Sequence, residues 1–319
     1  MLMAVPSTLN ISTTLNISIM QNRRSFIKQS GLLALGAMSA SPLSDMLITK
    51  KRKPIGVQLF TFFPTFDADV KGNLGKIKAI GFQEIESAFS MKGGIYGMTP
   101  KKFAAMTKEL GLAWRSHHVI GAPFKPNPNF DTSKMPKIDT LKNESQKLVD
   151  IVAEGGATYM VCAGIPHDTA DEVKEGAEIL NRAGEMARKA GLTFCYHNHD
   201  KEFKDVQGIV PFDYFASQIS ADLMKFELDL AWVSKAGVDP VALFKKHKGR
   251  FPLLHVKDFD KGFQNLMPVG EGVIDFKRIF SYAKTGGVKH YFVEHDMPKD
   301  AFASITSSMA YLKKIINNP

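Results

Sequence analysis

Cysteine is scarce in this chain, which has two among its 319 residues. Cys162 and Cys195 both lie in apolar runs, ATYMVCAG and LTFCYH, where a small buried thiol is the commoner role. An oxidising compartment would permit a disulfide between them, but we assign them no chemistry. Also missing is a Gly-x-Gly-x-x-Gly segment after any apolar run, and this absence excludes the usual dinucleotide-binding fold.

The charge is only mildly unbalanced. The formal net charge is +9, and removal of the first forty residues, with their three cations, would leave +6. With 44% hydrophobic and 23% charged residues, the composition is that of a globular protein of one large or two small domains. Lysine and glutamate are scattered rather than clustered, so we expect no nucleic-acid partner. An anionic substrate fits this charge equally well.

The first forty residues lack acidic side chains altogether. The segment NRRSFIKQSGLLALGAMSASP resembles a bacterial twin-arginine export signal, and its uncharged run over 29–43 is too short and too weakly apolar for a membrane span. We therefore expect residues 1–45 to be an export signal and linker, with the true start at Met1 or Met20. The mature protein is expected in the periplasm without stable membrane insertion. Because no clean Ala-x-Ala cleavage site is present, a tether formed by the uncleaved signal is the alternative.

From residue 54 onward, short apolar runs alternate with longer stretches of helical spacing. The longer stretches open on Thr or Asp and close on Gly, which are helix start and stop signals. Strands that alternate with helices predict a parallel sheet, and eight such units match the usual size of a (β/α)8 barrel. We therefore predict an α/β fold, a single-domain (β/α)8 TIM barrel over residues 54–316. The eight runs are 54–60, 82–88, 112–119, 157–164, 192–199, 224–233, 251–259 and 289–296.

Polar residues stand late in most of these runs. The active site of such a barrel lies at the C-terminal ends of its strands, so we interpret the clustering as an active site. His197 and His199 are two residues apart and would point to the same face of a strand. The late polar residues are Gln58, Glu86, His117, His118, His197, His199, Asp229, His255, Lys257, Asp258, Glu294, His295 and Asp296.

Seven short segments carry a resemblance to a known group of enzymes. They are GVQLFT, IGFQEIE, YHNHDKEF, FELDLAWV, LLHVKDFD, PVGEGVIDF and YFVEHD. From about residue 54 to the end, the chain resembles the sugar phosphate isomerase/epimerase group of the xylose isomerase-like TIM barrels. That group includes ketose epimerases, hydroxypyruvate isomerase, inosose dehydratase and endonucleases.

The resemblance implies one divalent metal ion held by residues from the fifth to the eighth strand. Carried over to this chain, the ligands fall on His197, Asp229, His255 and Glu294. His197 stands where the group usually has a glutamate, so His199 and Glu202 stay open as the fifth-strand ligand. Two imidazoles and two carboxylates are a chemically sound set, and the ion is expected to be manganese, zinc, cobalt, magnesium or iron.

The implied activity is that of an isomerase that moves a proton next to a carbonyl of a sugar or keto-sugar. Epimerases of the group use a glutamate on each side of the substrate, and this chain keeps only Glu294. One-base isomerisation, or dehydration by a lyase, is therefore favoured over a symmetrical two-base epimerisation. We expect Glu294 to move the proton, assisted by His118 or Lys257. The residues expected to line the substrate pocket are Gln58, Glu86, His199, Trp232 and Glu271.

Two other classes of protein stay open. An endonuclease of this barrel would need three metal ions and more ligands, whereas a non-catalytic sugar-binding protein would need no metal. Because free sugar phosphates are scarce outside the cytoplasm, an unphosphorylated sugar, keto-sugar or glycoside derivative is the expected partner. The exact substrate and the assembly of a homo-oligomer are left open by the sequence.

Overall fold

The computed structural model describes residues 53–123, 125 and 138–316. The predicted export signal over residues 1–45 lies outside these ranges. Within them, no helix is long and apolar enough to cross a membrane.

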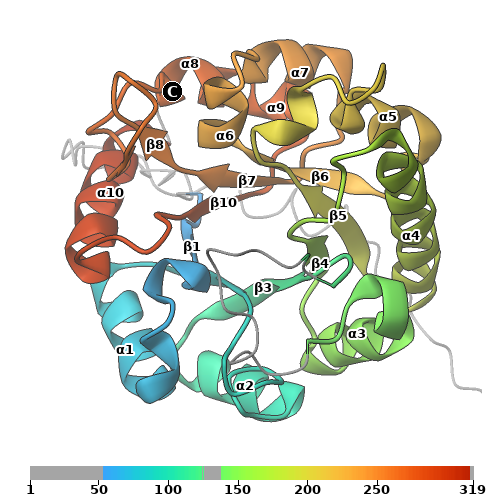
Figure 1. Ribbon diagram of the computed structural model, residues 1–319. Coiled ribbons are helices and arrows are strands. Elements are labelled where there is room, and N and C mark those ends of the chain that lie inside the picture. The colour runs from blue at the N-terminus through green and yellow to red at the C-terminus, as the bar shows by residue number, and fades with distance from the viewer. Residues whose placement is uncertain (1–52, 124, 126–137, 317–319) are drawn as a thin grey trace, which may run out of the picture. The chain divides into compact units, whose positions relative to one another are not determined.

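Eight parallel strands close into a barrel that is surrounded by helices (Figure 1). Each barrel strand lies within one of the eight predicted runs, so the predicted (β/α)8 TIM barrel is confirmed. In order around the barrel, the strands are β1 (Gly56–Gln58), β10 (His290–Val293), β7 (Leu253–Val256), β6 (Lys225–Asp229), β5 (Thr193–His197), β4 (Tyr159–Cys162), β3 (Ala113–Val119) and β2 (Glu84–Ser87).

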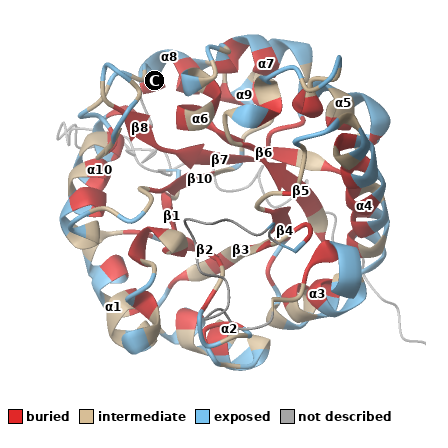
Figure 2. Ribbon diagram, viewed as in Figure 1, coloured by how far each residue is buried: buried red, intermediate tan, exposed pale blue. Residues whose placement is uncertain are grey.

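The helices follow the strands along the chain and bury one side each. In Figure 2 the strands are almost wholly buried, while the helices are buried toward the barrel and exposed on the outside. The described helices are α1 (Val70–Ile80), α2 (Pro100–Glu109), α3 (Leu141–Gly155), α4 (Ala170–Lys189), α5 (Pro211–Gln218), α6 (Leu230–Lys235), α7 (Pro240–Lys246), α8 (Phe276–Ser281), α9 (Ala283–Gly286) and α10 (Ala301–Ile315), with short 3-10 turns η1 (Leu59–Phe62), η2 (Phe66–Ala68) and η4 (Lys201–Phe203).

Helix ends lie where the start and stop signals predicted them. The side chain of Thr99 accepts a hydrogen bond from the backbone N–H of Lys102 at the start of α2, and Thr169 does the same for α4. Gly81 ends α1 with a φ of 113°, a left-handed conformation that only glycine adopts without strain. These local signals set the lengths of the helices between the strands.

Seven of the eight barrel strands end before their predicted runs do, and in β6 and β5 the early end affects candidate site residues. β6 stops at Asp229, because the Asp229 side chain accepts hydrogen bonds from the N–H groups of Ala231 and Trp232 and so begins α6. β5 stops at His197, so the expectation that His199 continues the same strand face is wrong. The chain turns after His197, and the His199 side chain is 44% exposed.

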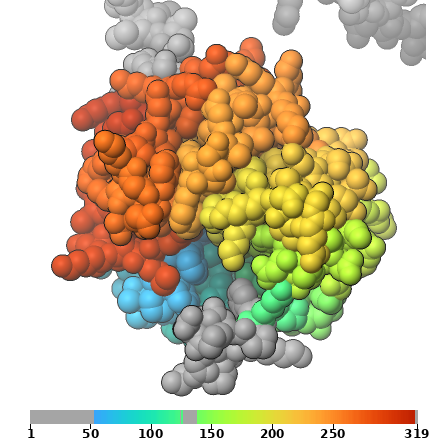
Figure 3. All heavy atoms as spheres, turned by 45° about the horizontal axis from the view of Figure 1, so that its top comes forward, coloured from blue at the N-terminus to red at the C-terminus, as the bar shows by residue number. Residues whose placement is uncertain are grey.

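A small hairpin follows β7 and is held by one buried carboxylate. β8 (Asp258–Phe259) pairs antiparallel with β9 (Leu266–Met267). Asp258 accepts hydrogen bonds from the N–H groups of Gly270, Gly272 and Ile274, which ties the following loop to the hairpin. In Figure 3 this orange part of the chain lies at the upper left of the face that is shown.

The barrel interior is closed by a small apolar layer, separate from the large core between strands and helices. Its members are Tyr159, Val161, Cys195, Leu253 and Phe292. Gly56 makes room for this layer, since a Cβ at that position would lie 2.4 Å from a ring carbon of Phe292. Cys162 and Cys195 are both buried and free, in agreement with the expected buried thiols.

We predict that alanine at Gly184 destabilises the fold whereas alanine at Gly75 does not. Both glycines are helical, and alanine favours a helix over glycine by about 0.5–1 kcal/mol. A Cβ on Gly184, however, would lie 2.5 Å from the carbonyl oxygen of Leu223. A Cβ on Gly75 would have no neighbouring atom within 4 Å. Urea unfolding should show Gly184→Ala less stable than wild type by about 1–3 kcal/mol. Equal stabilisation by both variants would contradict the packing described for α4.

Candidate active site

Seven of the eight barrel strands bring a polar side chain to the same end of the barrel. Because side chains alternate along a strand, the inward positions lie two residues apart, and the last inward position of each strand faces the barrel mouth. These side chains are buried or nearly so. They belong to Gln58 in β1, Glu86 in β2, His118 in β3, His197 in β5, Glu227 and Asp229 in β6, His255 in β7 and Glu294 directly after β10.

Three of these residues bring a buried ligand-type atom to a common point. The atoms are Oδ2 of Asp229, Nδ1 of His255 and Oε2 of Glu294, and the three lie within 4.8 Å of one another. His255 Nδ1 is 2.7 Å from Glu294 Oε2 and 3.9 Å from Asp229 Oδ2. Metal bonds of about 2.0–2.2 Å separate neighbouring ligand atoms by roughly 3–3.6 Å, a range that these distances bracket. The donor set therefore fits a divalent ion.

His197 lies next to these three residues. Its Nε2 is 3.9 Å from Asp229 Oδ2, and its ring is 4.5 Å from the ring of His255 between centroids. The two fifth-strand alternatives differ from His197 in exposure and hydrogen bonding. Glu202 is buried but accepts hydrogen bonds from the Tyr196 hydroxyl at 2.9 Å and the His199 N–H at 3.0 Å, and His199 is half exposed.

Buried carboxylates orient the two histidine rings from behind. His255 Nε2 is 2.6 Å from Glu86 Oε1 and 3.0 Å from Glu227 Oε2, and His197 Nδ1 is 3.2 Å from the same Glu227 oxygen. When these nitrogens donate to the carboxylates, the lone pairs of His255 Nδ1 and His197 Nε2 face the common point. Carboxylates that orient metal-binding histidines in this way are a usual feature of metal sites.

His118 balances the charge of the two orienting carboxylates. Its Nε2 is 2.7 Å from Glu227 Oε2 and 3.2 Å from Glu86 Oε1. Burial opposes protonation, but the charges of Glu86 and Glu227 outweigh it and raise the pKa of His118 to about 9. Burial likewise opposes ionisation of Glu86, yet the charges of His118 and His255 lower its pKa to about 2. His118 is therefore cationic at neutral pH, and Gln58 completes the group by donating to Glu86 at 2.8 Å.

Lys257 is a fully buried cation on the other side of the common point. Its Nζ is 2.6 Å from Glu294 Oε2, 3.3 Å from Asp229 Oδ2 and 3.0 Å from both carboxylate oxygens of Asp296. Burial would raise the pKa of Glu294, but the charges of Lys257 and His255 outweigh it and hold that pKa well below its usual range. Glu294 is therefore ionised at neutral pH.

Trp232 and His199 form the rim above this cluster. Their rings lie 5.8 Å apart between centroids, and the His199 ring also meets the edge of His197 at 4.9 Å. Glu271, which the sequence placed in the pocket, is exposed and accepts a hydrogen bond from Ser307 in α10. Among the described residues, we find no contact between Glu271 and the cluster.

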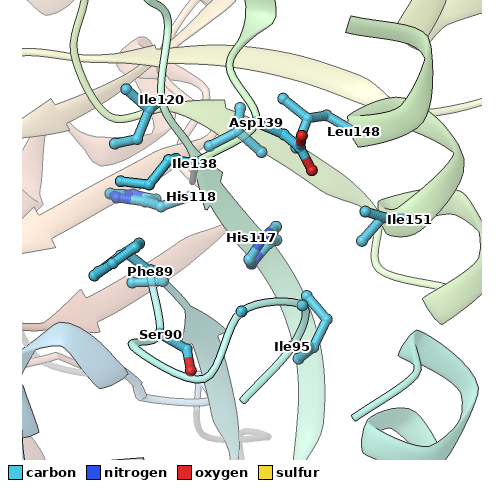
Figure 4. Close-up of a pocket in the computed structure, with 14 residues that line it drawn as sticks. Phe89, Ser90, Ile95, His117, His118, Ile120, Ile138, Asp139, Leu148 and Ile151 are labelled. Carbon is cyan, nitrogen blue, oxygen red and sulfur yellow. The ribbon is translucent and has the colours of Figure 1, made fainter. Parts of the chain in front are cut away.

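A mainly apolar pocket of about 90 Å³ adjoins His118. Figure 4 shows His117 and His118 projecting from opposite sides of β3, with Phe89, Ile120 and Ile138 beside His118. His117 does not enter the polar cluster. Its Nδ1 is 2.8 Å from the Ser87 hydroxyl, and burial, together with the charge of His118, lowers the pKa of His117 to about 3.

Not every late polar residue joins the candidate site. Asp258 ties down the loop after β9, and His295 Nδ1 is 2.8 Å from the Ser304 hydroxyl in α10. Glu227, by contrast, was missing from the predicted site residues. The signal for it was present, since Glu227 stands two residues before Asp229 and so shares its strand face.

We predict that metal binding depends on Glu227 as well as on the ligands. Asp229→Asn and Glu294→Gln should lose a bound divalent ion, whereas Glu227→Gln should weaken its binding by about 10–100-fold by releasing both histidine rings. Elemental analysis and chelator competition would measure this. Glu84→Gln is the matched control, because Glu84 is a buried carboxylate that pairs with Arg115 and His290 away from the mouth. Full metal retention in Asp229→Asn and Glu294→Gln would refute the ligand set.

We also predict a loss of stability in acid that depends on Glu202. Burial opposes its ionisation, but the hydrogen bond and charge of His199 outweigh it and lower the pKa of Glu202 from 4.5 to about 2. The stabilisation is therefore complete above pH 4.5 and is lost as the pH falls through about 2, with a size of about 3 kcal/mol. Urea unfolding of metal-free protein between these values should show a shallower pH dependence for Glu202→Gln. Identical slopes would contradict the assignment.

Comparison with known proteins agrees with this architecture. The sequence profile of the xylose isomerase-like TIM barrel family matches residues 74–315. The chain is similar to an inosose dehydratase of Lacticaseibacillus casei, with 27% identity over 238 residues that cover 66% of this chain and 78% of that protein.

The chain is also similar to proteins of known structure. A sugar phosphate isomerase/epimerase from Parabacteroides distasonis is 28% identical and superimposes with a TM-score of 0.70, covering 86% of this chain and 98% of that one. An L-ribulose 3-epimerase, 14% identical with a TM-score of 0.63 over 83% of this chain and 95% of that one, supports the fold alone.

Proposed function

The chain belongs to the xylose isomerase-like TIM barrel family, and from this premise we propose that it is a divalent-metal-dependent enzyme acting on a sugar-like substrate. In this proposal the enzyme removes a proton from the carbon next to a carbonyl. The observation that carries it is the convergence of buried ligand-type atoms on Asp229, His255 and Glu294. Two converging carboxylates are costly to bury unless positive charge compensates them, which Lys257 does in part and a divalent ion would do more fully.

His197, Asp229, His255 and Glu294 are the residues that would hold the ion. A bound divalent ion would polarise the substrate carbonyl and stabilise negative charge on its oxygen. Two imidazoles with two carboxylates suit manganese, zinc, cobalt or iron, and magnesium less well. The protein's own groups do the remaining work.

Glu294 is the proposed proton acceptor and Lys257 the proposed proton donor. Glu294 is ionised at neutral pH and lies at the mouth of the barrel, where a substrate carbon can approach it. The ammonium of Lys257 is 2.6 Å from Glu294, so the acid and the base stand on the same side of the site. His118 contacts Glu86 and Glu227, so it supports the site through these two carboxylates rather than by proton transfer to the substrate.

This one-sided arrangement favours dehydration over epimerisation. Epimerisation needs a second base on the opposite face, and there the chain has His197, whose ring nitrogens face Glu227 and Asp229. In dehydration Glu294 takes the proton next to the carbonyl, the C–O bond of the neighbouring hydroxyl breaks, and Lys257 protonates the departing oxygen to give water. The similarity to inosose dehydratase supports this outcome.

Isomerisation is the second candidate, because it begins with the same proton removal. The similarity to a sugar phosphate isomerase/epimerase favours it.

Both buried cations of the cluster, Lys257 and His118, are already paired with carboxylates, which favours an unphosphorylated sugar or keto-sugar. The twin-arginine signal predicted from the sequence agrees with such a substrate and with a periplasmic location. The rings of Trp232 and His199 would pack on the apolar face of the sugar.

We predict that metal-loaded enzyme in deuterated water exchanges a substrate proton next to the carbonyl. Candidate keto-sugars and inososes would be followed by NMR for deuterium and by mass spectrometry for loss of one water. Glu294→Gln should lower the exchange rate by at least about 10²–10⁴-fold, because it removes the proton acceptor and a proposed metal ligand together. Glu109→Gln on the outer face of α2, where Glu109 pairs with Lys71, is the matched control.

Loss of water with deuterium uptake would support the dehydratase, and uptake without loss of water the isomerase. Unchanged turnover by Glu294→Gln would refute the role of Glu294. Substrate binding without exchange or turnover, in a protein that holds no metal, would favour a sugar-binding protein instead.

A further inference from the structure

Lys257 occupies an unusual position for a residue beside a metal site. Its side chain is 2% exposed, and its ammonium contacts Glu294 Oε2 at 2.6 Å and Asp229 Oδ2 at 3.3 Å. These are two of the three converging oxygen and nitrogen atoms that face the proposed ion. A positive charge of the protein therefore stands against the same two oxygens that a divalent ion would bind.

The third contact of Lys257 leads away from the metal ligands. Both oxygens of Asp296 lie 3.0 Å from its Nζ, and the Asp296 side chain is 23% exposed at the mouth. The ammonium of Lys257 can therefore pair with the two ligand carboxylates, Asp229 and Glu294, or with the carboxylate of Asp296 at the rim. A flexible four-carbon stem allows an ammonium to shift between neighbouring acceptors.

The position of the Lys257 ammonium affects the affinity of the site for a divalent ion through electrostatic repulsion. Two like charges a few ångströms apart in a buried site repel strongly, since little water screens them. Without any cation, the carboxylates of Asp229, Glu294 and Asp296 would also repel one another. The ammonium therefore stabilises the metal-free site and opposes the entry of a divalent ion.

We propose that Lys257 is a built-in cation that neutralises the metal site when no ion is bound, and that Asp296 draws this ammonium aside when a divalent ion enters. The inference rests on the metal site of the proposed function. It assigns Lys257 and Asp296 a role as positioning residues that set the affinity for the ion, a role distinct from proton transfer to the substrate.

The test measures metal affinity rather than activity. Metal-free protein, prepared with a chelator, is titrated with Mn²⁺ or Zn²⁺ at one fixed pH in competition with a chromophoric chelator. Lys257→Met keeps the length and apolar stem of the side chain, and Lys257→Gln serves as a second variant should methionine disturb folding. Lys235→Met is the matched control, because Lys235 lies over the Trp232 ring at 4.7 Å without a described contact to the ligands.

We expect Lys257→Met and Lys257→Gln to bind the ion at least about tenfold more tightly than wild type, and Asp296→Asn about tenfold more weakly. Lys235→Met should bind like wild type. The double variant Lys257→Met/Asp296→Asn separates positioning from simple charge, because Asp296 acts through Lys257. In the methionine background, Asp296→Asn should therefore change the affinity by less than about threefold.

The outcomes separate this inference from the proposed function. Metal binding by wild type with equal or weaker binding by both Lys257 variants would overturn the inference alone. An undiminished effect of Asp296→Asn in the methionine background would overturn the role of Asp296. Absence of metal binding in wild type and in every variant would overturn both the inference and the proposed metal site.

Discussion

The structure depends on the balance of buried charge at the barrel mouth. Among the described residues, five carboxylates converge there, from Glu86, Glu227, Asp229, Glu294 and Asp296. In the same part of the chain, the cations in contact with them are Lys257, His118 and the ring of His255. Buried carboxylates of like sign are unfavourable unless cations and hydrogen bonds compensate them. In the proposed function, a divalent ion at the common point of Asp229, His255 and Glu294 would supply the missing positive charge.

The barrel makes this concentration of charge tolerable by ordering it in layers. The apolar layer of Tyr159, Val161, Cys195, Leu253 and Phe292 closes the interior. On the mouth side of this layer, Glu86 and Glu227 orient histidine rings, and beyond them the ligand atoms face the common point. Each charged residue therefore has a partner in the next layer. In the proposed reaction, Glu294 and Lys257 are the pair that acts on the substrate.

The sequence predicted the barrel well because both of its signals are local. Apolar runs and helix caps depend on neighbours a few residues away, as the Thr99 cap and the Gly81 turn illustrate. The sequence was a weaker guide where a single side chain or turn decides at which residue a strand ends. Asp229 ends its strand by capping α6, and the turn after His197 removes His199 from the strand face. Strand spacing places Glu227 on the same face as Asp229, but its role in orienting the histidine rings depends on contacts with residues 30 and more positions away.

Anomalous X-ray diffraction from crystals soaked in manganese or zinc tests the central claim most directly. The account predicts one strong peak at about 2.0–2.2 Å from Asp229 Oδ2, His255 Nδ1 and Glu294 Oε2, with His197 Nε2 as the fourth protein ligand. A peak bound instead among His118, Glu227 and the inner nitrogens of His197 and His255, or no peak at the mouth, would contradict it.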